Sequence, residues 1–100
     1  MIKCVCNEID SLNEVENLLN YKVFHLMEIS INIFDNKVLY YCDDADVLWM
    51  EYKEQPELKD ESPVLYKKIS KSEAEEEFFL RKEFWNKLNQ FINKFIVDNE

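Results

Sequence analysis

The stretch SKSEAEEEFFLRKEFWNKLNQFINKFIV, residues 70–97, is the longest periodic segment of the chain and decides the fold that we expect. At 100° per residue its apolar side chains fall on one arc, which indicates an amphipathic helix. Ser70 and Glu73 form a capping box that marks its start. Such a helix would be roughly 40 Å long, enough to cross a small sheet. The arc contains Ala74, Phe78, Phe84, Trp85, Leu88, Phe91, Ile92, Phe95 and Ile96.

The residues before this helix predict a sheet and one shorter helix. The shorter helix is expected over residues 11–20, where Ser11 and Glu14 form a second capping box. A helix between the first two strands favours a right-handed crossover and a parallel pair. The predicted fold class is therefore α+β: a two-layer sandwich with a mixed 4-5-stranded sheet, in the order β-α-β-β-β-(β)-α, and both helices on one face. Strands are expected at residues 2–6, 21–34, 38–42, 47–53 and 64–69.

Length and charge limit the classes of function. One hundred residues indicate a single α+β domain over residues 1–100, and 47% hydrophobic residues are enough for a core. A net charge of −9 repels phosphate backbones and anionic lipid surfaces. We therefore expect no direct binding to nucleic acid or membranes. The chain has no apolar run of about 20 residues and no signal region, which predicts a cytoplasmic protein.

The chain contains no glycine, and this excludes several catalytic and cofactor-binding motifs. Phosphate-binding loops, the dinucleotide fingerprint and the nucleophile elbow all need glycine for close backbone approach or for positive φ. We expect no cofactor and no catalytic residues. Tight turns must use asparagine or aspartate, as in the hairpin turn expected around Asn36.

Cys4, Cys6, Cys42 and the single histidine, His25, could together supply four zinc ligands. Structural zinc sites usually take cysteines that are two to four residues apart on a turn. A Cys-Val-Cys segment in an extended strand instead aims both thiols in one direction without turning around an ion. We interpret the three cysteines as reduced, small core residues and predict no metal site. An aspartate-rich turn at residues 43–46 also lacks the ligand spacing and glycine of a calcium loop.

Negative charge is concentrated between residues 43 and 61, where eight acidic residues accompany two lysines and give a local net charge of −6. Part of this segment, residues 54–63, is expected to be an exposed acidic loop. Aromatic residues interleaved with the acidic ones predict an acidic rim around aromatic anchors. The simpler interpretation is a solvated loop. The predicted partner-binding residues are Asp43, Asp44, Asp46, Trp49, Glu51, Glu54, Glu57, Asp60 and Glu61, with Phe79 of the long helix as a further contact.

Two hypotheses about function follow. The first is a small acidic non-catalytic binding module that inhibits or neutralises a partner protein with a basic surface, such as a nuclease or nucleic-acid-binding protein. In size and acidity, but in no sequence motif, the chain is similar to toxin-immunity proteins, antitoxins and phage inhibitors that imitate DNA. The alternative is a structural or regulatory subunit that forms a homodimer through the long C-terminal helix, whose apolar arc is wider than one sheet requires.

Overall fold

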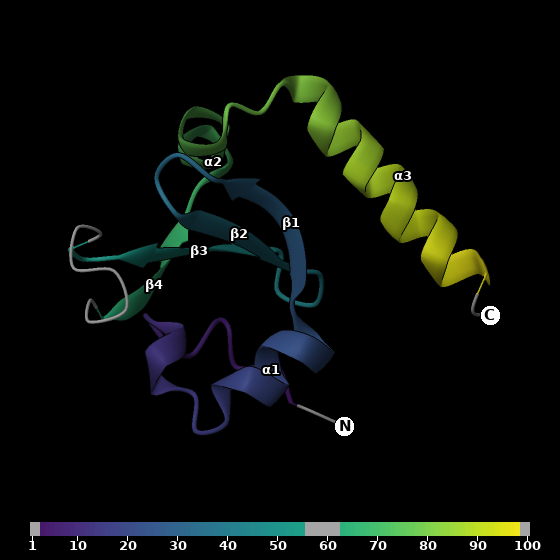
Figure 1. The fold of residues 1–100 in the computed structure, drawn as a ribbon. Coiled ribbons are helices and arrows are strands. Elements are labelled where there is room, and N and C mark those ends of the chain that lie inside the picture. Colours follow the sequence, from purple (N-terminus) through teal and green to yellow (C-terminus); the bar gives the residue numbers. More distant parts are fainter. Residues whose placement is uncertain (1–2, 56–62, 99–100) are drawn as a thin grey trace.

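The computed structural model of the protein describes residues 3–55 and 63–98, with side chains as far as residue 92. This part of the chain has an α+β fold with a four-stranded antiparallel sheet and three α-helices (Figure 1). The helices are α1 (Leu18–His25), α2 (Lys71–Phe78) and α3 (Lys82–Asp98), and a 3-10 turn, Leu12–Glu14, precedes α1. The strands are β1 (Met27–Asn32), β2 (Lys37–Cys42), β3 (Val47–Lys53) and β4 (Val64–Ile69).

The sheet has the strand order β1-β2-β3-β4, so each strand pairs with the next one along the chain. The bounds predicted for β3 and β4 are confirmed. The β1–β2 turn places Asn36 at φ 55°, and the β2–β3 turn places Asp46 at φ 52°. Asparagine and aspartate tolerate this left-handed region better than other residues that have a Cβ. The prediction that Asn36 takes positive φ is therefore confirmed.

Both faces of the central strands are covered. Along β2, Tyr40 and Cys42 face one core, whereas Leu39 faces the other. This alternation follows from the two-residue repeat of a strand. The first core contains Cys6, Leu12, Tyr21, Leu26, Tyr40, Cys42, Trp49 and Tyr66. The second core contains Leu39, Leu48, Met50, Ile69, Ala74 and Phe78.

Helices α1 and α2 lie on opposite faces of the sheet, so the prediction that both helices cover one face is wrong. The segment from Cys6 to Leu26, which includes α1, packs on the first core, and α2 packs on the second core through Ala74 and Phe78. Figure 1 shows α1 and α2 on either side of the strands. The cause is that β2 and β3 present apolar side chains on both faces, and each face needs its own cover.

Residues 3–6 do not form the predicted first strand. The segment is irregular, and a turn follows in which the N–H of Glu8 donates to the carbonyl oxygen of Val5 at 2.9 Å. The N–H of Val5 donates to the phenolic oxygen of Tyr21 at 3.1 Å instead of to a neighbouring strand. The prediction of a mixed sheet is also wrong, since its parallel pair required this first strand. The pairings among the described strands are all antiparallel.

The first α-helix begins later than the sequence predicted. The capping box at Ser11 and Glu14 is present, but it closes only a 3-10 turn. A second cap follows at Asn17, whose side-chain oxygen accepts from the N–H of Asn20 at 3.4 Å, and α1 starts there. Residues 21–25, which were expected in a strand, therefore belong to α1. Their aromatic and β-branched side chains favour strands only weakly, and the cap at Asn17 prevails.

The predicted long helix is broken into α2 and α3. Its start is as expected, with the Ser70 and Glu73 capping box in place. The break occurs at Phe79, which has φ 56°, and the N–H groups of Phe79 and Leu80 both donate to the carbonyl oxygen of Glu75. This is how a helix usually ends in the left-handed conformation. A side-chain hydrogen bond connects the two helices: Trp85 Nε1 in α3 donates to Glu75 Oε1 in α2 at 2.8 Å.

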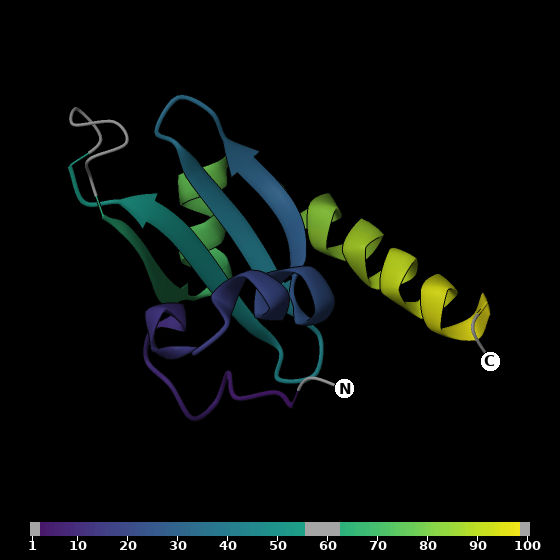
Figure 2. The same ribbon diagram turned by 60° about the horizontal axis from the view of Figure 1, so that its bottom comes forward.

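Helix α3 runs outward past the β1 edge of the sheet in both views (Figures 1 and 2). Its described apolar residues are only partly covered: Phe84, Trp85 and Leu88 are half-buried, Phe91 is 57% exposed and Ile92 is buried. Phe95 and Ile96 belong to the predicted arc but lie outside the residues whose side chains are described. None of the helices described is long and apolar enough to cross a membrane.

Replacing Phe79 with glycine tests the break between α2 and α3. A left-handed conformation costs a residue with a Cβ about 1–2 kcal/mol, and glycine adopts it without this cost. We expect Phe79→Gly to raise the free energy of unfolding by about 1 kcal/mol, measured by urea denaturation. The matched control is Phe79→Ala, which also removes the exposed ring but keeps the Cβ. An equal effect of the two substitutions would contradict this account.

Candidate functional site

The acidic turn between β2 and β3, residues 43–46, is the part of the predicted binding region that the structure presents most clearly. Asp43, Asp44 and Asp46 are all exposed. The turn is fixed from two sides: the hydroxyl of Tyr41 donates to Asp46 Oδ1 at 2.8 Å, and Asp44 Oδ2 lies 3.8 Å from His25 Nδ1. The three carboxylates therefore stand at one end of the sheet in a defined arrangement.

The remaining predicted acidic residues do not join this turn. Glu51 and Glu54 lie toward the far end of β3. At about 3.3 Å per residue, seven strand residues separate Glu54 from the acidic turn by roughly 23 Å. Glu57, Asp60 and Glu61, and most of the predicted exposed loop 54–63, lie outside the described residues. The acidic segment is continuous in sequence but does not form one surface in the part of the fold that is described.

The two predicted contact residues Trp49 and Phe79 differ in exposure: Trp49 is buried and Phe79 is exposed. Trp49 is 0% exposed and its Nε1 donates to Cys6 Sγ at 3.3 Å, so it belongs to the first core and cannot contact a partner from there. Phe79 is exposed, as predicted. Its exposure follows from the helix break and not from its angle on a continuous helix. An exposed phenylalanine at a helix end is a contact residue only if a partner reaches it.

Glu51 belongs to a network that stabilises the fold. Its Oε1 accepts from Lys22 Nζ at 3.0 Å and from the hydroxyl of Tyr66 at 2.6 Å, and Lys22 Nζ also donates to the Tyr66 oxygen at 2.9 Å. Burial, and then the hydrogen bond to Glu51, raise the pKa of Tyr66 to about 12. Burial alone would lower the pKa of Lys22, but its hydrogen bonds to Tyr66 and Glu51 prevail and raise it.

A groove opens beside the acidic turn. It lies where the end of α1, the start of β1 and the end of β2 meet α3. Asp43 and His25 are its polar residues. Its remaining lining is apolar or aromatic and consists of Val23, Phe24, Leu26, Met27, Tyr41 and Ile92. The groove therefore combines an apolar floor with a carboxylate contributed by the acidic turn.

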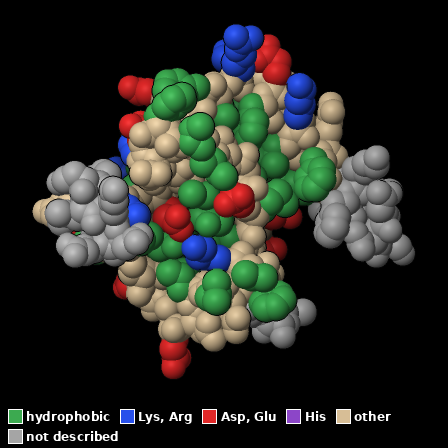
Figure 3. Space-filling model, in the orientation of Figure 1, with side chains coloured by type: hydrophobic (Ala, Val, Ile, Leu, Met, Phe, Trp, Pro, Cys, Tyr) green, Lys and Arg blue, Asp and Glu red, His purple; other side chains and the backbone are tan. Residues whose placement is uncertain are grey.

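Apolar side chains on α1 extend this surface. Leu19 and Val23 are one helical turn apart and both are exposed, and Phe24 beside them is 74% exposed. Figure 3 shows hydrophobic side chains spread over this face of the molecule, from α2 across β1 to α1, with both acidic and basic groups among them. Large exposed apolar side chains that lie close together mark surfaces that bind other molecules more often than do single ones.

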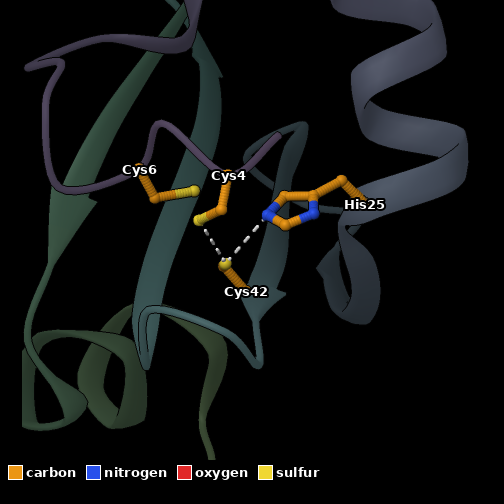
Figure 4. Close-up of side chains that lie close together, drawn as sticks. All are labelled: Cys4, Cys6, His25 and Cys42. Atoms are coloured by element: carbon orange, nitrogen blue, oxygen red, sulfur yellow. Dashed lines mark hydrogen bonds between the residues drawn. The ribbon is translucent and has the colours of Figure 1, made fainter. Parts of the chain in front are cut away.

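The four residues that were considered as zinc ligands lie together (Figure 4). Their ligand atoms are all within 4.8 Å of one another. Cys42 Sγ lies 3.6 Å from Cys4 Sγ and 3.2 Å from His25 Nε2. Cys6 Sγ completes the cluster, and its own contacts are with the Tyr21 hydroxyl at 3.1 Å and with an indole N–H.

The cluster brings together a Cys, a His and an Asp in the order of a nucleophilic triad, but Cys42 is poorly suited to nucleophilic attack. Its side chain is fully buried, so a substrate cannot reach the sulfur. Burial raises the pKa of the Cys42 thiol, and the neutral thiol is a weak nucleophile. Of the chemistries open to these four residues, metal ligation is the one that needs no access for a substrate.

Sequence reasoning missed the groove and discounted the Cys/His cluster. The exposed Val23 and Phe24 were assigned to a strand, where alternation would have buried one of them. The argument against a zinc site assumed that Cys4 and Cys6 lie on a strand, and the structure has no strand at these residues. The sequence carries no local signal for the cluster, because packing between segments that are distant in the chain brings the four residues together. Comparison with protein-family models, with curated proteins and with solved structures found no match to this chain.

Tyr66→Phe tests the network around Glu51. The pKa of Tyr66 in the folded protein lies above the unfolded value of about 10, so its stabilisation is complete below pH 10 and is lost as the pH rises through about 12. At about 1.4 kcal/mol per pKa unit the loss is about 2–3 kcal/mol. We expect urea denaturation at pH 9–12 to show a shallower decline in the variant. Other buried tyrosines with a raised pKa, such as Tyr40, keep part of the decline. An unchanged pH dependence would contradict the assignment.

Proposed function

We propose that this chain is a small acidic non-catalytic binding module that holds a partner protein by a basic surface and thereby inhibits or neutralises it. The observation that carries the proposal is that Asp43, in the exposed acidic turn at residues 43–46, lines an apolar groove. An acidic rim speeds the encounter with a basic partner, and an apolar floor slows its release.

The residues that line the groove indicate the chemistry of the partner surface. A bulky apolar side chain would enter the groove against Phe24 and Met27, and a lysine or arginine beside it would meet Asp43. Nucleases and other nucleic-acid-binding proteins present such surfaces, with basic residues around exposed apolar ones. The net charge of −9 argues against nucleic acid itself as the ligand. This chemistry fits an immunity protein, an antitoxin or a phage inhibitor equally well.

Support for a non-catalytic role comes from the cluster that most resembles a catalytic group. Cys42 is closed off from solvent, and glycine is absent from the whole chain. The groove contains one carboxylate, Asp43, and the single histidine of the chain, which faces Cys42 at its Nε2. A general acid and base pair aimed at a common point is not formed by these two residues.

Selection from a displayed peptide library tests the binding proposal without a known partner. We expect the wild-type chain to enrich peptides that combine lysine or arginine with a bulky apolar residue. The double variant Asp43→Lys/Asp46→Asn should bind these peptides about 10-fold or more weakly at low salt, since it removes the attraction at the rim. Asparagine retains the left-handed conformation at residue 46, and Asp44 is kept because it contacts His25. Affinities are measured by surface plasmon resonance.

Two matched controls make this test specific. Glu16→Lys/Glu76→Gln raises the net charge by the same amount at exposed positions away from the groove, and it should leave binding nearly unchanged. Phe24→Ser should weaken binding, whereas Phe34→Ser should not, although Phe34 is 86% exposed at the opposite end of β1. Equal losses within either pair, or no enriched peptides, would contradict the proposal.

A second candidate function, self-association through α3, is favoured by one observation. Phe91 lies on the apolar arc of this helix, yet it is 57% exposed, while its neighbour Ile92 is buried. A second copy that packed along α3 would cover Phe91 and the half-buried Leu88. This alternative makes the groove irrelevant and the helix the functional surface.

Sedimentation velocity distinguishes the two candidates. If α3 is the interface, the wild-type chain should be a dimer at micromolar concentration, and Phe91→Ser should raise the dimer dissociation constant at least about 10-fold, because an aromatic anchor at an interface carries more than about 1 kcal/mol. Phe34→Ser serves again as the control, since it removes an equally large exposed ring elsewhere. If the wild-type chain is still a monomer at about 100 times this micromolar concentration, this alternative is excluded.

A further inference from the structure

We propose that Cys4, Cys6, His25 and Cys42 bind one Zn²⁺ ion as a structural site. The proposal does not depend on the binding function above. It replaces the interpretation of the cysteines as ordinary core residues, which does not explain why three thiols and the only imidazole of the chain converge at one point of the first core.

The spacing of the ligand atoms fits a tetrahedral ion. Zinc binds sulfur at about 2.3 Å and imidazole nitrogen at about 2.0–2.1 Å, which places two sulfurs about 3.8 Å apart and a sulfur and nitrogen about 3.6 Å apart. The corresponding distances are 3.6 Å between the sulfurs of Cys4 and Cys42, and 3.2 Å from Cys42 Sγ to His25 Nε2. With all four atoms within 4.8 Å, shifts of about 1 Å complete the tetrahedron.

His25 is oriented as a metal ligand. Its side chain is only 7% exposed, its Nε2 faces the sulfurs, and its Nδ1 faces the carboxylate of Asp44 at 3.8 Å. Metal-binding histidines commonly present their second nitrogen to a carboxylate, which fixes the ring and increases its basicity. Asp44 therefore has a specific role behind the site, separate from that of the exposed Asp43.

Hydrogen-bond donors surround the sulfurs. The N–H of Ala45 approaches Cys42 Sγ at 3.4 Å, and both Trp49 Nε1 and the hydroxyl of Tyr21 approach Cys6 Sγ. Binding of the ion would release three thiol protons to solvent and leave a site of net charge −1 with a neutral histidine. Donors aimed at sulfur stabilise the thiolate form, and they offset this buried charge.

The donor set selects zinc. Three thiolates and one imidazole in a closed tetrahedral arrangement suit Zn²⁺, whereas magnesium and calcium require oxygen ligands. A disulfide between Cys4 and Cys42 is the competing outcome, since their sulfurs are adjacent, but it would leave Cys6, His25 and the surrounding donors without a shared role. The buried position of the cluster fits a structural ion and not a catalytic one, because no open coordination position faces solvent.

The ion would connect three separate segments. The irregular N-terminal segment supplies Cys4 and Cys6, the last residue of α1 supplies His25, and the last residue of β2 supplies Cys42. Residues 3–6 pair with none of the described strands, and a small chain with a limited core gains most from such a cross-link. The site also anchors the acidic turn that begins directly after Cys42.

Metal analysis of the purified chain tests the site. Protein prepared anaerobically with a reductant should contain one zinc per chain by inductively coupled plasma mass spectrometry. All three thiols should react with a thiol reagent only after a strong chelator is added, and the chelator should lower the melting temperature. The metal-free chain should bind one Co²⁺ with the charge-transfer absorption of thiolate ligation.

Single substitutions assign the ligands. Cys42→Ser and His25→Gln should each weaken metal affinity by at least 100-fold, more than the loss of an outer partner. Asp44→Asn should weaken it about 10- to 100-fold, and Asp43→Asn, the matched control, should leave it unchanged. If a ligand variant fails to fold, the Co²⁺ titration of the wild-type chain decides the question. Less than half an equivalent of bound metal, full affinity in the ligand variants, or isolation of a Cys4–Cys42 disulfide would overturn the proposal.

Discussion

The structure depends on one constraint: β2 and β3 are covered on both faces, which divides the core of a 100-residue chain into two small halves. Neither half can rely on apolar burial alone, because the area buried per face is limited. The second half is closed by α2. The first is closed by the segment from Cys6 to Leu26, which combines α1 with irregular stretches, and polar contacts hold it: the hydrogen bonds of Tyr21, the network around Glu51, and the cluster around Cys42.

Local signals in the sequence predicted local structure well. The bounds of β3 and β4, the cap at Ser70 and the turn at Asn36 depend on residues close in the chain, and all were found. The errors concern what distant segments do to one another. The strand expected at residues 2–6 does not form over the described residues 3–6, where the N–H of Val5 donates to Tyr21 and not to a neighbouring strand. The prediction that both helices pack on one face is wrong because periodicity shows which side of a strand is apolar but not which helix packs against that side.

The candidate site shows the same division. Exposure of the turn at residues 43–46 was predictable, since aspartates gather between two strong strands. Burial of Trp49 was not, because the alternation of β3 allows either face to be wet. Convergence of Cys6, His25 and Cys42 is set by packing between segments up to 36 residues apart, which spacing alone cannot reveal. The same packing puts the acidic turn directly beside the cluster, with Asp44 Oδ2 3.8 Å from His25 Nδ1.

The left-handed positions at Asn36, Asp46 and Phe79 are all held without glycine, and glycine is absent from the entire sequence. Glycine is the residue whose backbone loses most freedom when a chain folds. Its exclusion narrows the ensemble of the unfolded chain, so less conformational entropy is lost on folding. The apolar burial of this protein is split between two small cores, and the absence of glycine adds to its stability by lowering the conformational entropy of the unfolded chain.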